Sequence, residues 1–216
     1  MRRPHRLARL LLVWAVVTGA GSSLAPAHQA GPVRSRTAVE PELSAHPSLA
    51  VIQPAPDFSL LDSNGALVRR SDFRGRVVLL SFIYASCPTA CPLISQRMAL
   101  LQSRLRSRGS FPSRVALLSV TVDPERDSAA VLDRYAHGFS ADPRGWRFLR
   151  ESRERLAPVL AAYDEWTRSV ASGEIEHPAR LYLIDARGRV REIYSLALFD
   201  ERQALLDIHA LLREPS

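Results

Sequence analysis

Lysine is absent from this 216-residue chain, and cysteine and methionine occur only twice each. The 29 basic residues other than histidine are therefore all arginines. Four of them, Arg2, Arg3, Arg6 and Arg9, lie in the first nine residues, which leaves 25 arginines against 22 acidic residues, a net charge of +3. Those 25 are dispersed among acids rather than interleaved with aromatic residues on a basic stripe, so a nucleic-acid-binding surface is not supported.

The two cysteines, Cys87 and Cys91, lie four residues apart and directly follow the apolar run at 77–84. A buried strand followed by two thiols at the start of a helix is typical of thiol chemistry or of soft-metal binding. A structural disulfide is the alternative, but a bridge that closes so short a loop restrains little of the unfolded chain. The spacing alone leaves redox chemistry and metal binding both open.

The first 27 residues have the pattern of an export signal, with a basic start, an apolar run and a small-residue Ala25-Pro26-Ala27 cleavage pattern. The apolar run is shorter than the roughly 20 residues that span a bilayer, yet an uncleaved membrane anchor stays open. Residues 28–53 contain prolines without a sustained period, which predicts a flexible linker. We therefore expect an exported protein, in the periplasm or at the outer face of the inner membrane.

The remaining residues, 54–216, suit one domain with a single core. Apolar runs at 77–84 and 115–122 predict buried strands, and Asn64-Gly65 between short apolar runs predicts a hairpin. A shorter strand is expected around 146–149 and a second hairpin over 180–194. Apolar residues at three- and four-residue steps predict the helices, which we expect to begin at Pro92, at a cap formed by Asp127 and Ser128, near 156, and near 205.

Strand–helix alternation followed by an antiparallel hairpin predicts a central mixed sheet flanked by helices. We therefore predict the α/β class, with a thioredoxin-like three-layer fold and an N-terminal β-hairpin. The two cysteines then fall at the carboxyl end of a central strand, where open α/β sheets place their sites. A thiolate at a helix N-terminus has a lowered pKa, and Pro92 suits the first helical turn because the N–H it lacks has no partner there.

Three motifs together resemble the SCO/SenC family: Cys-Pro-Thr-Ala-Cys-Pro at 87–92, Val-Asp-Pro-Glu-Arg-Asp at 122–127, and His177 ahead of the run at 181–188. The resemblance covers about Pro54 to Leu212. It implies a thioredoxin-fold copper protein, expected as a monomer, that helps assemble the copper site of cytochrome c oxidase. The implied partners are the copper-site subunit of that oxidase and an upstream copper donor or thiol reductant.

In that family two cysteines and one histidine bind copper, so the resemblance carries the ligand roles to Cys87, Cys91 and His177. Thiolates favour Cu(I) and imidazole helps to retain Cu(II), whereas a closed zinc site would need a fourth ligand. Pro178 departs from the family, which usually has a small hydroxyl residue there. The polar segment at 166–176 is expected to be a mobile loop that could move His177.

Two other functions share the cysteines. A metal-independent thiol–disulfide oxidoreductase of the cell envelope needs only the dithiol, and His177 discriminates it from a copper protein. A thiol peroxidase of the peroxiredoxin class has a Pro-x-x-x-Thr-x-x-Cys pattern, which Leu80 and Tyr84 break here. Met98 is expected to fill the core rather than to bind metal.

Overall fold

The structure is a computed structural model that describes residues 43–44 and 49–215. The expected signal or anchor at 1–27 and most of the expected linker lie outside the described residues. None of the helices in the described part of the chain is long and apolar enough to cross a membrane.

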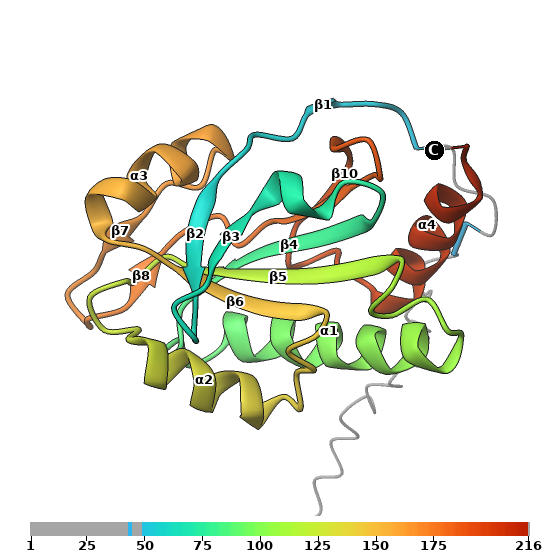
Figure 1. The fold of residues 1–216 in the computed structure, drawn as a ribbon. Coiled ribbons are helices and arrows are strands. Elements are labelled where there is room, and N and C mark those ends of the chain that lie inside the picture. The colour runs from blue at the N-terminus through green and yellow to red at the C-terminus, as the bar shows by residue number, and fades with distance from the viewer. Residues whose placement is uncertain (1–42, 45–48, 216) are drawn as a thin grey trace, which may run out of the picture. The chain divides into compact units, whose positions relative to one another are not determined.

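One eight-stranded sheet forms the centre of the fold, with the strand order β1-β10-β9-β4-β5-β6-β2-β3 (Figure 1). The neighbours β4, β5 and β6 are parallel, whereas β9 runs antiparallel to β4, so the predicted mixed sheet is confirmed. The predicted N-terminal hairpin is formed by β2 and β3, and β2 extends the sheet beyond β6. The strands of this sheet are β1 (Gln53–Pro54), β2 (Ser59–Asp62), β3 (Leu67–Arg69), β4 (Val77–Ile83), β5 (Val115–Thr121), β6 (Trp146–Arg150), β9 (Leu181–Ile184) and β10 (Arg189–Tyr194).

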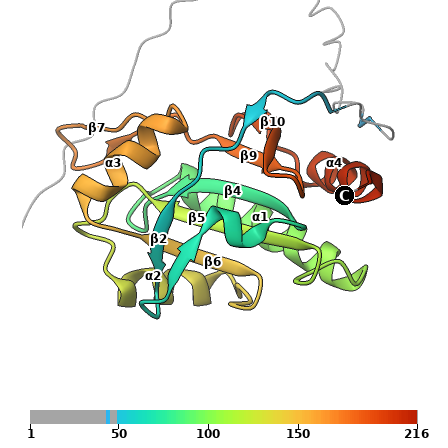
Figure 2. The ribbon, with the colours of Figure 1, turned by 45° about the horizontal axis from the view of Figure 1, so that its top comes forward.

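Helices cover both faces of this sheet (Figures 1 and 2). The crossover helices α1 and α2 lie on one face, α4 packs against α1, and α3 lies on the opposite face. All residues of β4 and β5 are buried, as expected for strands covered on both sides. The helices are η1 (Arg70–Phe73), α1 (Ala90–Ser107), α2 (Ala129–Gly138), α3 (Arg153–Ala162) and α4 (Glu201–Arg213).

Three local predictions need correction. Helix α1 begins at Ala90 rather than Pro92, so Cys91 already lies in its first turn. Ser128 alone caps α2, by accepting a hydrogen bond from the N–H of Val131, and Asp127 is used elsewhere. The segment expected to be a loop contains a two-stranded hairpin of β7 (Arg168–Ser169) and β8 (Ile175–Glu176).

The end of the expected linker belongs to the folded part. The N–H of Ile52 donates a hydrogen bond to the carbonyl of Val190, and Gln53 pairs with the same strand, β10. The carbonyl of Leu49 accepts a hydrogen bond from the Arg191 guanidinium at 3.0 Å. These contacts tie residues 49–53 to the outer edge of the sheet.

Candidate thiol and metal site

The two cysteines follow the central strand β4 and lie at the N-terminus of α1. The N-cap residue of this helix, Thr89, makes no side-chain capping hydrogen bond. Instead the Cys91 N–H donates a hydrogen bond to the Cys87 sulfur at 3.3 Å. A backbone N–H of the first helical turn thus finds its acceptor in a sulfur atom. The sequence of the loop therefore directs Cys87 onto the positive end of the helix, and both thiols are free and buried.

The environments of the two sulfurs are unequal. A hydrogen bond from the Cys91 thiol, together with backbone donors from Cys91 and Thr89, lowers the pKa of Cys87 from 9.0 to about 5. The hydrogen bond to Cys87 and burial raise the pKa of Cys91. Such a difference in acidity, with one thiol ionised more readily than its neighbour, suits thiol–disulfide exchange.

Tyr84, three residues before Cys87, links the thiols to a distant part of the chain. Its hydroxyl accepts a hydrogen bond from the Ile175 N–H at 3.2 Å, and the Tyr84 side chain helps to lower the pKa of Cys87. Its backbone N–H donates to the Cys91 sulfur at 3.5 Å. The edge of its ring contacts His177, with ring centroids 6.1 Å apart. In the sequence, Tyr84 is marked only as an aromatic residue at the end of a buried strand, which does not indicate its contacts with the cysteines and His177.

His177 reaches this end of the sheet through strand pairing. Because β9 is antiparallel to β4, the start of β9 lies beside the end of β4, and Leu181 pairs with Ser81. His177 precedes β9 by four residues and is thereby brought against Tyr84, which leads from β4 into the loop at 85–89 that carries Cys87 (the thiol loop). Its side chain is only 3% exposed, and its Nδ1 lies 3.3 Å from a carboxylate oxygen of Glu165.

The structure does not bring the three predicted ligands together as a completed metal site. Within residues 43–44 and 49–215, no group of three His, Cys, Asp or Glu side chains is close enough to hold a metal ion. Cys87 and Cys91 contact each other, whereas Tyr84 contacts both Cys87 and His177. A three-ligand site therefore requires the imidazole or the thiol loop to move relative to Tyr84.

Sequence reasoning missed the acidic residues around the site. Asp127, expected as a helix cap, instead accepts hydrogen bonds from the Ala85 N–H at 3.0 Å and from the Thr121 hydroxyl. It thereby ties the thiol loop to the end of β5, and burial raises its pKa. Glu165 follows α3, where nothing in the sequence marked it, because its contact with His177 arises from tertiary packing.

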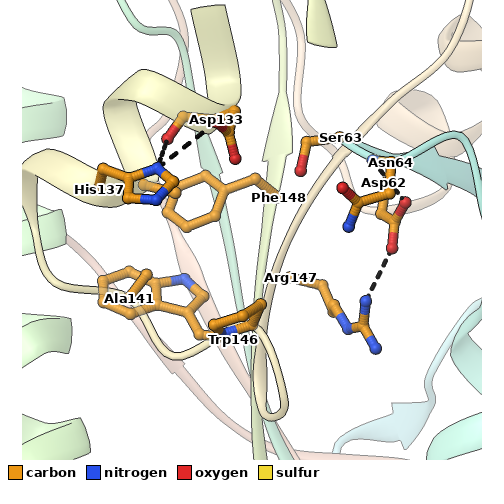
Figure 3. Close-up of a pocket in the computed structure, with 11 residues that line it drawn as sticks. Asp62, Ser63, Asn64, Asp133, His137, Ala141, Trp146, Arg147 and Phe148 are labelled. Atoms are coloured by element: carbon orange, nitrogen blue, oxygen red, sulfur yellow. Dashed lines mark hydrogen bonds and ion pairs between the residues drawn. The ribbon is translucent and has the colours of Figure 1, made fainter. Parts of the chain in front are cut away.

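A cavity of about 150 Å³ lies away from the thiols, between the β2–β3 hairpin and α2 (Figure 3). Its charged side chains are bonded to nearby groups: Arg147 contacts Asp62 at 2.8 Å, and His137 contacts the Asp133 carbonyl at 2.8 Å. No cysteine lines it. These pairings describe a hydrogen-bonded surface hollow, so we place the functional site at the thiol end of the sheet.

Comparison with known proteins identifies the family of the chain. The SCO1/SenC family model matches residues 50–213. The chain belongs to the SCO1/SenC family. Its match to a bovine mitochondrial SCO2 homolog is 34% identical over 146 residues, which are 65% of this chain and 53% of the relative. The chain thus spans about half the length of the curated mammalian relatives it matches.

Solved structures of the family share the fold. The copper-bound ScoI of Bradyrhizobium japonicum is 27% identical, with a TM-score of 0.62, over 73% of this chain and 99% of ScoI. BsSco, described as having a disulfide switch and as a cytochrome c oxidase assembly protein, is 20% identical with a TM-score of 0.67, over 78% and 100% of the two chains. The predicted thioredoxin-like α/β fold is confirmed.

Proposed function

We propose that this protein binds copper through Cys87, Cys91 and His177 and delivers it to, or reduces the cysteines of, the copper site of cytochrome c oxidase. The observation that carries the proposal is the unequal thiol pair at the N-terminus of α1, together with the antiparallel pairing of β4 and β9, because His177 precedes β9 and the cysteines follow β4. Family membership and the copper-bound ScoI support the choice of metal.

The donor set fits copper cargo. Two sulfurs suit Cu(I), and one imidazole adds a donor that Cu(II) also accepts. The Cys87 sulfur is a thiolate near neutral pH, because its pKa is about 5, so only the Cys91 proton must leave when copper binds. Three ligands leave the metal open to a fourth donor from a recipient protein, which favours transfer over permanent retention.

The same pair can reduce a disulfide. The Cys87 thiolate attacks one sulfur of the target disulfide, whose S–S bond breaks to release one thiolate and leave a mixed disulfide. Cys91 then loses its proton and attacks Cys87, which releases the second target thiolate. The target gains two electrons, and Cys87 and Cys91 become a disulfide. Since oxidised Cys87 and Cys91 hold no copper, this exchange also controls whether copper can be loaded.

The ligand role of His177 decides between these functions. Reduced wild-type protein and the His177→Ala variant should be titrated with Cu(I) against a competing chelator and with Cu(II) by absorption spectroscopy. We expect one copper per wild-type chain, at least a tenfold loss of affinity in the variant, and altered thiolate-to-copper charge-transfer bands. Unchanged affinity and bands would contradict a three-ligand site. Exposed His137→Ala is the matched control, because its side chain is 78% exposed and lies on α2.

A metal-independent thiol–disulfide oxidoreductase of the cell envelope is the second candidate. It is favoured by the arrangement of the described residues, in which the thiols are paired with each other and His177 contacts Glu165. This function predicts that His177→Ala reduces a model protein disulfide at the wild-type rate, while Cys87→Ser does not. The two assays together separate the candidates.

We further propose that the protein acts outside the cytoplasm, in the periplasm or at the outer face of the inner membrane. The supporting evidence is the basic and apolar pattern of residues 1–27. The N-terminal mass of the mature protein tests it: cleavage after Ala27 indicates a released protein, and an intact N-terminus in the membrane fraction indicates an anchor. An intact N-terminus in the cytoplasm would contradict the proposal.

A further inference from the structure

Glu165 is the least expected group near the proposed site. Its side chain is 0% exposed, although carboxylates are rarely buried unless they are paired. One oxygen accepts a hydrogen bond from the Arg180 N–H at 3.2 Å, and the other lies 3.3 Å from His177 Nδ1. A carboxylate that is removed from water needs such donors, and the imidazole is the one side-chain donor that contacts it in the described part of the chain.

Several bonds hold Glu165 and His177 against each other. The Glu165 N–H donates to the Leu160 carbonyl at 2.8 Å, which anchors Glu165 to the end of α3. Arg180, the residue before β9, donates from its guanidinium to the carbonyl and carboxylate of Asp164 at 2.7 and 2.9 Å. The segment before β9 is thus fastened to the segment after α3.

The backbone beside each partner is strained. Asp164, next to Glu165, has a φ of +53°, and Ala179, two residues after His177, has a φ of +52°. Residues other than glycine adopt this left-handed conformation at a cost, and it persists where the surrounding structure requires it. One such residue adjoins Glu165 and the other lies close to His177. The backbone on both sides of the Glu165–His177 contact is therefore held in an unusual conformation by the surrounding fold.

We propose that Glu165 is a positioning residue for copper binding: its carboxylate accepts the Nδ1–H of His177 and thereby leaves Nε2 as the nitrogen available to the metal. Metal-bound histidines commonly donate their other ring N–H to a carboxylate, which sets the tautomer and the ring orientation. This inference rests on the proposed function, because it assigns a role toward the same ligand.

A backbone N–H near the His177 ring competes with the Glu165 carboxylate for the same ring nitrogen. The Ala179 N–H lies 3.2 Å from the same Nδ1 and favours the opposite tautomer, in which Nδ1 accepts a hydrogen bond and Nε2 carries the proton. A protonated Nε2 has no lone pair for a metal. Glu165 opposes that tautomer, because two acceptors, Nδ1 and a carboxylate oxygen, would otherwise face each other at 3.3 Å.

The first test needs no metal. Long-range ¹H–¹⁵N correlation spectra of reduced, metal-free, ¹⁵N-histidine-labelled protein at about pH 8 report which ring nitrogen carries the proton. We expect the Nδ1–H tautomer for wild-type His177, assigned by its loss in His177→Ala. Glu165→Gln should shift the population toward Nε2–H, because the amide can donate to Nδ1. Glu154→Gln, an exposed carboxylate on α3, is the control and should leave the spectrum unchanged.

The second test is Cu(I) affinity measured by competition. We expect Glu165→Gln to weaken binding by about 10- to 100-fold, the range typical for partners of metal-bound histidines. Wild-type His177 in the Nε2–H tautomer would overturn the inference even if the variant failed to fold. Tighter copper binding by Glu165→Gln would also overturn it, because Glu165 would then hold His177 away from the thiols. If His177→Ala binds copper as tightly as wild type, the proposed three-ligand site fails. The metal-free spectra would still decide separately whether Glu165 sets the tautomer of His177.

Discussion

The backbone N–H of Cys91 donates a hydrogen bond to the Cys87 sulfur at 3.3 Å, so the helix that carries one cysteine stabilises the thiolate of the other. This geometry depends on the three-residue spacer and on the start of α1 at Ala90. The two sulfurs consequently differ in acidity although both are buried. The pH dependence of thiol reactivity and of folding stability follows from this difference in acidity.

The reactivity of Cys87 should therefore persist at acidic pH. Because the pKa of Cys87 is about 5, thiolate absorbance and the rate of alkylation should fall to half only near pH 5, well below the ordinary range of a thiol. Cys91→Ala removes the largest stabilising hydrogen bond and should raise that midpoint by at least one pH unit. Cys91→Ser, which keeps a hydroxyl donor, should shift it less. A midpoint above pH 8 in the wild type would contradict the asymmetry.

Tyr84 should contribute a smaller share of the same effect. The Tyr84 hydroxyl helps to lower the pKa of Cys87, so Tyr84→Phe should raise that pKa while leaving the ring contact with His177 in place. The loss of the hydroxyl also leaves the Ile175 N–H without this acceptor. The measurement is the pH profile of alkylation. An identical profile in wild type and variant would show that the hydroxyl does not contact the thiolate in solution.

Much of this arrangement could be predicted because it follows from chain order. The buried runs at 77–84 and 115–122 and the helix between them predict parallel neighbours, and the hairpin over 180–194 predicts an antiparallel addition. Once β9 pairs with β4, the start of one strand must lie beside the end of the other. The placement of His177 beside Tyr84, at the end of β4 that leads to the cysteines, is therefore a consequence of topology.

The contacts that orient the side chains could not be predicted in this way. Glu165 meets His177 only because α3 ends and β9 begins at matching points, a coincidence of tertiary packing with no periodic signal in the sequence. Asp127 stands one residue before the true cap, Ser128, and local pattern does not distinguish a capping acid from one that reaches across to the thiol loop. Residues such as Glu165 and Asp127, which contact other residues of the site rather than a ligand, have the weakest signal in the sequence.

The acidity of Cys87 should also appear in the pH dependence of folding. Its folded-state pKa of about 5 lies below the unfolded value near 8.5. Between these values the unfolded chain binds a proton that the folded chain does not, so Cys87 stabilises the fold increasingly as pH rises. This contribution is present above about pH 8.5 and is lost as pH falls through 5.

Urea unfolding of reduced wild type and Cys87→Ser at about pH 5, 7 and 8.5 measures this contribution. We expect the difference in their midpoints to change with pH in favour of the wild type. A difference that stays constant across this range would show that the Cys87 pKa is the same in the folded and unfolded states. The oxidised protein, which has no thiol to titrate, is a further control.

Arg126 should hold the β7–β8 hairpin near the site. Its guanidinium donates to the Gly173 carbonyl at 2.8 Å and pairs with Asp123, so it joins the loop after β5 to the hairpin that precedes His177. Arg126→Ala should raise hydrogen exchange at the hairpin amides several-fold and lower global stability by about 1–3 kcal/mol, because Arg126 pairs with Asp123, whose side chain is only 4% exposed.

Arg153→Ala is the matched control for Arg126→Ala, since Arg153 forms an exposed ion pair with the neighbouring Glu125 and does not bond the hairpin. Both variants remove one arginine and its ion pair from the same region, but only Arg126→Ala also loses the bond to Gly173 and the partner of the buried Asp123. Faster exchange confined to Arg126→Ala would show that this bond restrains the segment leading to His177. Equal exchange in both variants would show that this bond does not restrain the hairpin.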